Sequence, residues 1–295
     1  MKNIAAIIVT YNPEVSILHE LVHSLEDQVG EVFLIDNDSN NISYIFNDIS
    51  LLFVTPIVNS KNIGLAAAQN IGISLAKNKG FTDIVLFDQD SQVSVNFIKD
   101  LVEQRQILEE KNIQVSAIGP TLVDRESLYK YPATMYKGIF KKRPEMNGGL
   151  VETTFTISSG SLISIDTLDR VGSMDEKYFI DYIDVEWCIR AKKFGFKSFM
   201  SSDVEMLHDM GDKKINILGK KFSLHSDFRC FYIFRNGCYL LRTEYVPYSY
   251  KRLVLFNNVI RFFLNIYASD KKIKTIKRSI NGWWHGFFDN IDGIK

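Results

Sequence analysis

Residues 4–12 read IAAIIVTYN, a continuously apolar run that ends in three residues able to form hydrogen bonds. A short apolar run rich in β-branched residues is typical of a strand buried on both faces of a parallel sheet. The pattern returns at residues 32–39, VFLIDNDS, and at residues 84–91, IVLFDQDS. We therefore predict three buried strands, each followed directly by polar residues.

Helical patterns alternate with these strands. Apolar residues recur at helical spacing in residues 15–28, and small residues in 66–78 favour a closely packed helix. With a further strand at 51–54, the alternation predicts an α/β fold whose mostly parallel sheet is flanked by helices. Ligands of such sheets bind beyond the carboxyl ends of the strands, so the polar residues there should converge on one edge.

The second part of the chain is less regular. We expect a helix at residues 96–111, strands at 115–118 and 155–165, and a loop that enters a helix between residues 178 and 193.

Composition and charge restrict the class of protein. The chain has 295 residues, 46% of them apolar, and can bury one large core. Its formal net charge is zero, but residues 213–278 hold 15 Lys and Arg against only Asp227, Glu244 and Asp270. That basic stretch is the expected contact for an anionic partner.

Cysteines and targeting signals indicate a cytoplasmic protein. Cys188, Cys230 and Cys238 match no metal-ligand spacing and lie in apolar or aromatic surroundings, so we interpret them as reduced core residues. No secretory cleavage pattern follows the N-terminus, and the apolar run at residues 253–268 is interrupted by Asn and Arg. We expect neither a signal peptide nor a membrane-spanning helix.

Two acidic clusters can carry chemistry. Asp88 and Asp90 follow a strand at a spacing that lets their carboxylates share a hard cation, Mg²⁺ or Mn²⁺. Asp184 and Glu186 lie where a helix is expected to begin, and His208 is a chemically suitable third metal ligand. Taken singly, each also has a structural interpretation, the acids as turn or cap residues and the histidine as a core residue.

Five segments together resemble family 2 glycosyltransferases, in the order in which that family has them. They are IIVTYN at 7–12, LIDNDS at 34–39, NIGLAAAQNIG at 62–72, LFDQDS at 86–91 and FIDYIDVEWCIR at 179–190. The resemblance covers about residues 3–210 and looks like the bacterial rhamnosyltransferase branch. It implies a GT-A catalytic domain over 1–212, with a nucleotide-sugar half to about 95 and an acceptor half after it, and a helical C-terminal region at 213–295.

The resemblance also implies roles for individual residues. Asp88 and Asp90 would form the family's DXD-type site and bind Mn²⁺ or Mg²⁺ together with His208. The nucleotide sugar would be contacted by Thr10, Tyr11, Asn12, Asp36, Asn37, Asn62, Gly64, Asn70, Asp88 and Gln89.

The base is the one role where the sequence departs from the family. Asp184 aligns with the family's catalytic base, and Glu186 and Trp187 would contact the acceptor or the sugar. Many relatives have Glu directly before the base, whereas Ile183 stands there in this chain and Glu186 follows two residues later. It is therefore open whether Asp184 or Glu186 takes the proton, and we favour Asp184. The base would deprotonate the attacking hydroxyl, the metal would stabilise the departing diphosphate, and the anomeric carbon would be inverted.

The same branch implies the substrates. They would be dTDP-rhamnose as donor and a lipid-linked surface glycan, such as O-antigen or capsule, as acceptor at the inner face of the cell membrane. We expect loops around residues 129–149 and Trp187 to select the acceptor.

The C-terminal region predicts a basic amphipathic helix. Leu253, Phe256, Ile260 and Phe263 recur at helical spacing, and a basic cluster follows at residues 271–278. Such a helix can lie on an anionic membrane, pack on the catalytic core or form a homodimer interface, and the aromatic run NGWWHGFF at 281–288 fits each use.

Other functions fit less well. A nucleotidyltransferase would need a Gly-rich basic loop after the first strand, and a dehydrogenase would need GxGxxG, but the chain has TYNPE there. A non-catalytic sugar-nucleotide binding protein of the same fold remains an alternative that a transfer assay would separate from an enzyme. No nucleic-acid recognition motif accompanies the basic stretch, so we expect no nucleic-acid partner.

Overall fold

The computed structural model describes residues 2–41, 52–125, 127–137, 140–208, 214–217, 220–223, 227–269 and 271–289, with the side chains of 208, 214–217, 220–223 and 227 outside the description. The chain divides into two compact units. The first, here called the sheet unit, comprises Met1–Met135, Lys142–Phe179 and Ile183–Asp209. The second, the helical unit, comprises Tyr136–Lys141, Ile180–Tyr182 and Met210–Lys295.

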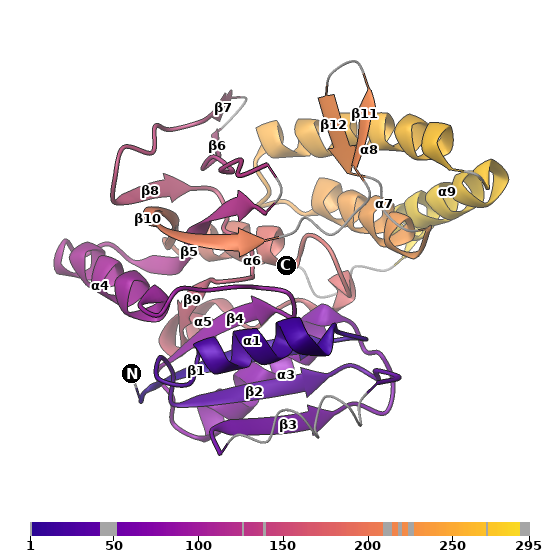
Figure 1. Ribbon diagram of the computed structural model, residues 1–295. Helices are drawn as coiled ribbons and strands as arrows, with labels where there is room; N and C mark the ends of the chain where they lie inside the picture. Colours follow the sequence, from indigo (N-terminus) through magenta and orange to yellow (C-terminus); the bar gives the residue numbers. More distant parts are fainter. Residues whose placement is uncertain are drawn as a thin grey trace. The chain divides into compact units, whose positions relative to one another are not determined.

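An eight-stranded sheet forms the centre of the sheet unit (Figure 1). In spatial order its strands are β3 (Val54–Val58), β2 (Glu31–Asp36), β1 (Ile4–Thr10), β4 (Asp83–Asp88), β9 (Leu162–Ser164), β5 (Val115–Asp124), β10 (Lys197–His208) and β8 (Leu150–Thr153). β9 runs antiparallel to β4 and β5, and β8 runs antiparallel to β10. The pairs among β3, β2, β1 and β4 and the pair of β5 with β10 are parallel, which confirms the predicted α/β sheet.

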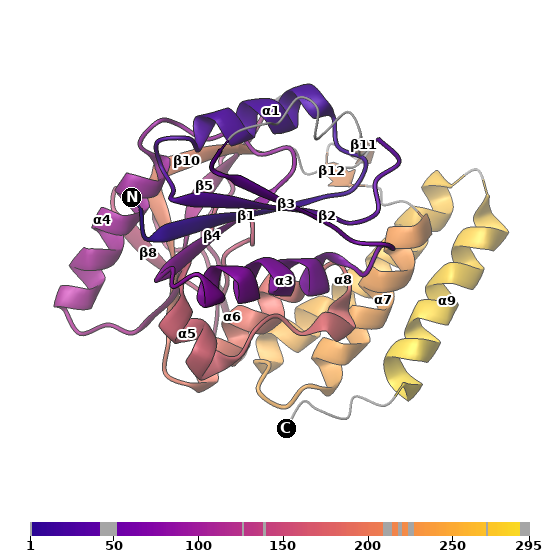
Figure 2. The same cartoon turned by 90° about the horizontal axis from the view of Figure 1, so that it is seen from below.

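Helices cover both faces of this sheet. Figure 2 shows α1 (Val15–Ser24) on one face and α3 (Leu65–Asn78), α5 (Ile165–Val171) and α6 (Ile183–Lys193) on the other. Leu18 and Leu21 of α1 share one apolar cluster with Ile8 of β1 and with Phe97 and Leu101 of α4 (Phe97–Glu110). The sheet is therefore a buried middle layer, which explains why its strands are apolar on both faces.

Gly72 allows α3 to approach β1 closely. A Cβ atom at this position would lie 2.5 Å from Cγ2 of Ile7, closer than real Cβ contacts come. The small residues of this helix therefore pack tightly against the sheet, as the sequence predicts.

Four predicted boundaries are wrong. β5 runs from Val115 to Asp124, six residues beyond the end of the strand expected at residues 115–118. β3 begins at Val54 and contains Pro56, whereas we expected a strand at residues 51–54; proline fits because β3 is an edge strand of the sheet. Of the strand expected at 155–165, only Leu162–Ser164 is present, because a turn with Gly160 at φ 79° precedes it. α1 ends at Ser24 rather than near residue 28.

The helical unit contains α7 (Asp227–Arg242), α8 (Tyr248–Ala268) and α9 (Lys272–Phe288), together with the hairpin of β11 (Lys214–Ile217) and β12 (Lys220–Ser223). α8 and α9 agree with the predicted helical C-terminal region. α7 also lies within the helical region predicted at residues 213–295, although we predicted no separate bounds for it. Within the described residues, no helix combines the length and the apolar character needed to cross a bilayer.

We expect Gly72→Ala to destabilise the protein, although alanine is the better helix former. The added methyl group would press on Ile7 in a packed core, and overpacking of this kind costs about 1–3 kcal/mol. Urea unfolding followed by circular dichroism measures the free energy of unfolding. Ser74→Ala, at an exposed position of the same helix, is the matched control and should keep or slightly raise stability. Equal stability of the two variants would contradict the close packing.

Candidate functional site

The carboxyl ends of β1, β2 and β4 form one row. In the parallel registers Thr10 lies opposite Asp36, and Val9 lies opposite Asp88. The chain continues from β1 through β2 to β3 on one side and places β4 on the other, so the strand order reverses between β1 and β4. Open α/β sheets bind ligands at such a switch point. The predicted convergence of the three polar clusters is thus confirmed.

A buried anchor holds the loop after β2. The Thr10 hydroxyl donates a hydrogen bond to Asp36 Oδ1 (3.0 Å), and the Ser39 N–H donates to Asp36 Oδ2 (2.9 Å). Asn12, in the left-handed region at φ 48°, donates its N–H to Ser39 Oγ (2.7 Å). Thr10 and Asp36 are both 0% exposed, so these groups set the shape of the loop from beneath.

A second anchor connects β2 to the start of α3. The Asn37 Nδ2 donates to Asn62 Oδ1 (3.0 Å), and Asn37 Oδ1 accepts from the Ile63 N–H (3.0 Å). Gly64, at φ 89°, precedes the helix, and a Cβ there would lie 2.5 Å from the ring of Phe179. Glycine is required at this position because both the backbone conformation and the space exclude a side chain.

The turn after β4 is braced by its neighbours. The Tyr11 N–H donates to Gln89 Oε1 (2.8 Å), which joins the loops after β1 and β4. The Asp88 N–H donates to Ser159 Oγ (3.0 Å), and Ser159 Oγ lies 2.7 Å from Ser91 Oγ. The acidic turn is therefore held from two sides.

The end of β10 lies beside the acidic turn. Gln92 and Leu207 form an antiparallel bridge, which brings the backbone of His208 to the same edge as Asp90. Arg125 Nη2 donates to the Asp90 carbonyl (3.3 Å), while no partner for the Asp90 carboxylate is found in the described part of the chain.

The structure describes the side chains of two of the three predicted metal ligands, Asp88 and Asp90. Asp88 and Asp90 supply the oxygen donors that Mg²⁺ and Mn²⁺ prefer, and both are partly exposed. The His208 side chain lies outside the described residues, and no group of three ligands is assembled by the side chains that are described. The carboxylates of Asp88 and Asp90 are thus chemically suitable ligands for a divalent cation.

Asp184 lies in the first turn of α6 and is partly exposed. Its Oδ2 accepts the Ser158 N–H (3.2 Å), and its Oδ1 accepts the Val185 N–H (2.8 Å). Because Ser158 is followed by Ser159, one short loop contacts both Asp184 and Asp88. Sequence reasoning missed this loop, although Ser-Ser-Gly at residues 158–160 is a turn signal within the strand we expected.

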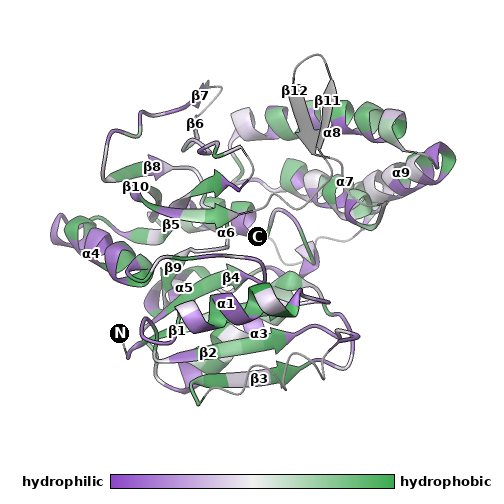
Figure 3. Ribbon diagram, in the orientation of Figure 1, coloured by the Kyte–Doolittle hydropathy of each residue, from purple (hydrophilic) through white to green (hydrophobic). Residues whose placement is uncertain are grey.

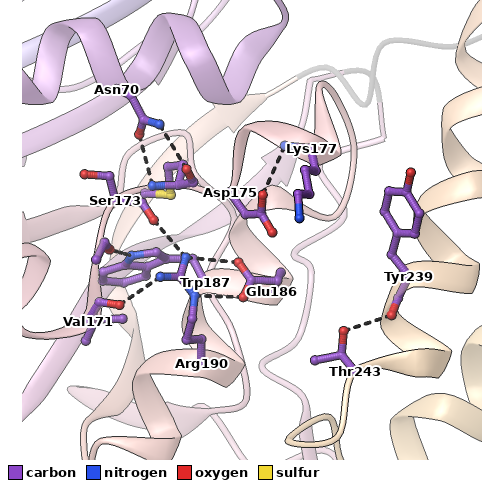
Figure 4. A network of polar contacts seen from close by, with 12 residues as sticks. Asn70, Val171, Ser173, Asp175, Lys177, Glu186, Trp187, Arg190, Tyr239 and Thr243 are labelled. Atoms are coloured by element: carbon purple, nitrogen blue, oxygen red, sulfur yellow. Dashed lines mark hydrogen bonds and ion pairs between the residues drawn. The ribbon is translucent and has the colours of Figure 1, made fainter. Parts of the chain in front are cut away.

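Glu186 faces Arg190, and Trp187 lies beside them in the same polar network (Figure 4). Both side chains are 1% exposed. Glu186 Oε1 and Oε2 accept from Arg190 Nε (2.8 Å) and Nη2 (3.1 Å), and Trp187 Nε1 donates to the Gly172 carbonyl (2.8 Å). This burial argues against the predicted contacts of Glu186 and Trp187 with acceptor or sugar.

Asn70 fastens α3 to the segment before the short 3₁₀ helix η1 (Glu176–Tyr178) (Figure 4). Its Nδ2 donates to the Met174 carbonyl and to Glu176 Oε1, both at 2.9 Å, and its Oδ1 accepts the Met174 N–H (3.0 Å). These bonds explain its presence on structural grounds, and its contact with the nucleotide stays a prediction.

The segment before α6 has an unusual backbone. Phe179, Asp181 and Tyr182 all have φ near +60°, the left-handed region that side chains disfavour. Within the helical unit, Arg229 Nη2 and Nε donate to the Asp181 carboxylate at 2.8 and 3.1 Å. Asn236 Nδ2 donates to two carbonyls of the same segment, at 2.7 and 3.0 Å. α7 thus holds a strained segment directly ahead of α6.

The three cysteines are buried thiols, as predicted. Burial raises the pKa of Cys188 to about 11 and that of Cys238 to about 12. Cys188 and Cys238 therefore stay protonated at neutral pH.

Comparison with known proteins gives matches along the whole chain. The profile of glycosyl transferase family 2 matches residues 5–172. The dTDP-rhamnosyl transferase RfbF of Shigella flexneri is 35% identical over 100% of this chain and 96% of its own length. The low-salt glycan biosynthesis hexosyltransferase Agl10 of Haloferax volcanii is 21% identical over 97% of this chain and 91% of its own.

Solved structures share the fold. GalNAc-T7, crystallised with UDP, GalNAc and Mn²⁺, has a TM-score of 0.62 at 18% identity; the match covers 85% of this chain and half the length of that protein. TarS 1–349 of S. aureus in complex with UDP-GlcNAc has a TM-score of 0.58 at 15% identity and covers 96% of this chain and 79% of its own. Both support a GT-A arrangement of strands and helices.

We expect Glu186→Gln to lower stability by on the order of 3 kcal/mol, because it removes the carboxylate from a buried pair with Arg190. Asp166→Asn is the matched control: Asp166 faces Arg170 at the same four-residue spacing, but its side chain is 79% exposed. Exposed pairs contribute at most about 1 kcal/mol. Chemical unfolding of both variants measures the difference, and equal losses would contradict the structural role of Glu186.

Proposed function

Because this chain belongs to glycosyl transferase family 2, it is a glycosyltransferase, and we propose that it moves L-rhamnose from dTDP-rhamnose to a hydroxyl group of a lipid-linked surface glycan. The end-to-end likeness to the dTDP-rhamnosyl transferase RfbF, at 35% identity, supports this donor. A glycan such as O-antigen or capsule is the proposed acceptor, and the inner face of the cell membrane is the proposed place of the reaction, with the protein in the cytoplasm.

The donor binds, in this proposal, at the carboxyl ends of β1, β2 and β4. Loops anchored by Thr10, Asp36 and Asn37 surround the nucleotide, and Asn62 and Gly64 line its approach to α3. The buried anchors support the proposal because a preformed loop loses little conformational freedom when a ligand binds.

The proposal is supported above all by the different environments of Asp184 and Glu186 at the start of α6. Asp184 is partly exposed and is linked through residues 158–159 to the acidic turn, whereas Glu186 is buried against Arg190. Asp184 is therefore the proposed base. It takes the proton of the acceptor hydroxyl while that oxygen bonds to the anomeric carbon and the bond to the diphosphate breaks. Attack opposite the leaving group inverts the anomeric carbon.

Asp88, Asp90 and His208 would hold a divalent cation. A bound Mn²⁺ or Mg²⁺ supplies positive charge that stabilises the departing diphosphate. The oxygen donors of the two acids and the bridge between Gln92 and Leu207 support this assignment. Arg125, beside Asp90, adds a fixed positive charge to the same edge.

We expect purified protein with Mn²⁺ to release dTDP from dTDP-rhamnose in the presence of a lipid-linked acceptor, and not UDP from UDP-GlcNAc. Chelation should abolish release. Asp90→Asn should raise the Mn²⁺ concentration for half-maximal activity by at least about 10- to 100-fold, the loss that changes to mere hydrogen-bond partners of metal ligands cause. Asp38→Asn is the control, since Asp38 is an exposed carboxylate of the neighbouring loop that we assign no role. Release from UDP-GlcNAc in place of dTDP-rhamnose would overturn the proposed donor.

We expect Asp184→Asn to lower kcat about 10²- to 10⁴-fold with little change in donor binding, because it removes the general base. Asp166→Asn replaces an exposed acid in the first turn of α5 and controls for the effect of charge at a helix start. Rapid-quench turnover and calorimetric titration with dTDP separate chemistry from binding. Wild-type turnover of Asp184→Asn would remove Asp184 from the mechanism.

A further inference from the structure

α9 buries its smallest residues. Thr275, Ser279, Gly282 and Gly286, at intervals of four, three and four, form its buried face. A Cβ at Gly282 would lie 2.5 Å from the Phe231 carbonyl oxygen of α7, so the two helix backbones approach closely. Small residues at this spacing allow helices to pack without large side chains between them.

The opposite face of α9 carries four large apolar side chains, whereas Trp283 packs against Phe234 and Phe262. Ile273, Ile280, Trp284 and Phe287 are 73%, 51%, 61% and 48% exposed. At 100° per residue these four positions fall on one stripe, turned away from the buried face. A helix that only packs on a protein core shows the reverse arrangement, with large apolar residues inside.

Cations border this stripe. The side chains of Lys272, Lys274, Lys277 and Arg278 are exposed, Lys271 precedes them, and α9 contains no Asp or Glu. Ile273 lies among these cations at the start of the helix. Figure 3 shows the resulting mixture of apolar and polar residues along α9.

α8 also exposes an apolar stripe. Phe256, Val259 and Phe263 are 63%, 45% and 64% exposed, while Tyr250, Val254, Asn258 and Asn265 are buried. Two helices of one unit thus expose apolar stripes.

The charge decides between the candidate partners of α9. In a symmetric homodimer the same patch would face itself and bring the cations of two copies together, which is unfavourable. An anionic lipid surface attracts those cations and accepts the apolar stripe among its acyl chains.

We propose that α9 docks this glycosyltransferase on an anionic bilayer, parallel to the surface, with Ile280, Trp284 and Phe287 inserted and the lysines on lipid phosphates. The inference deepens the proposed function, on which it rests for its link to a lipid-linked acceptor. Its basis, the exposed stripe and its charges, is independent of the chemistry at Asp184.

The test is sedimentation of the full chain with vesicles of phosphatidylcholine, with or without phosphatidylglycerol. We expect binding only to the anionic vesicles, with salt weakening it. Lys274→Glu/Lys277→Glu should weaken binding at least about tenfold, since each cation near an anionic surface contributes measurably. Trp284→Ser/Phe287→Ser should weaken it similarly and abolish quenching of tryptophan fluorescence by brominated lipids.

Matched controls separate the stripe from general effects. Phe140→Ser replaces an aromatic side chain that is 63% exposed elsewhere, and Lys99→Glu/Lys111→Glu repeats the charge change on the exposed surface of α4 and at its C-cap. Both should bind vesicles like the wild type. Equal binding to neutral and anionic vesicles, or unchanged binding of both α9 variants, would overturn the proposal. Lipid-free dimers that Trp284→Ser/Phe287→Ser dissociates would assign the face to self-association instead.

Turnover with a water-soluble acceptor distinguishes this proposal from the proposed function. We expect the α9 variants to keep wild-type turnover in solution. If the protein binds vesicles but transfers no sugar, the proposed function is refuted and membrane docking is not. If it transfers sugar but does not bind vesicles, membrane docking is refuted and the proposed function is not.

Discussion

A hydrogen bond between Thr10 and Asp36, fully buried, joins the ends of two neighbouring parallel strands. β4 pairs with the other side of β1, also in parallel, and this places Asp88 in the same row. Because side chains alternate between the faces of a sheet, a slip of one residue in either pair would turn these groups to the wrong face. Because β1 is apolar on both faces, its apolar residues alone do not specify the register. The buried hydrogen bond between Thr10 and Asp36 favours one register, and the assembly of the polar edge depends on it.

The period of the helix separates the two acids of α6. Successive residues are about 100° apart, so two residues correspond to about 200°, and Asp184 and Glu186 point to nearly opposite sides. One side is open and receives N–H groups from Ser158 and Val185; the other is closed by Arg190. Access to the acceptor side therefore distinguishes the two carboxylates. The two-residue spacing leaves the base open in the sequence, and in the folded helix it supports our proposal of Asp184, because only that side is open.

Much of the fold could be predicted because buried parallel strands leave a strong apolar signal: β1, β2 and β4 begin and end within one residue of their predicted bounds. β3 could not, since Pro56 is acceptable only at a sheet edge, and an edge is a property of the assembled sheet. At the site, the acidic residues could be identified from the sequence, but the residues that hydrogen-bond with them could not. Ser159 reaches Asp88 across 71 positions, and no local periodicity encodes such a contact. The ion pair that accompanies the burial of Glu186 could have been predicted, because Arg190 follows four residues later on the same face of the helix.

Residues 180–182 belong to the helical unit, although the chain on either side of them belongs to the sheet unit. The Asp181 carboxylate and the Arg229 guanidinium are therefore partners that lie on opposite sides of any single cut near residue 210. A chimera of two homologues joined there would combine a left-handed segment from one parent with clamping residues from the other. The segment to exchange between homologues is therefore discontinuous in sequence. A chimera should take residues 180–182 from the same parent as the C-terminal helices.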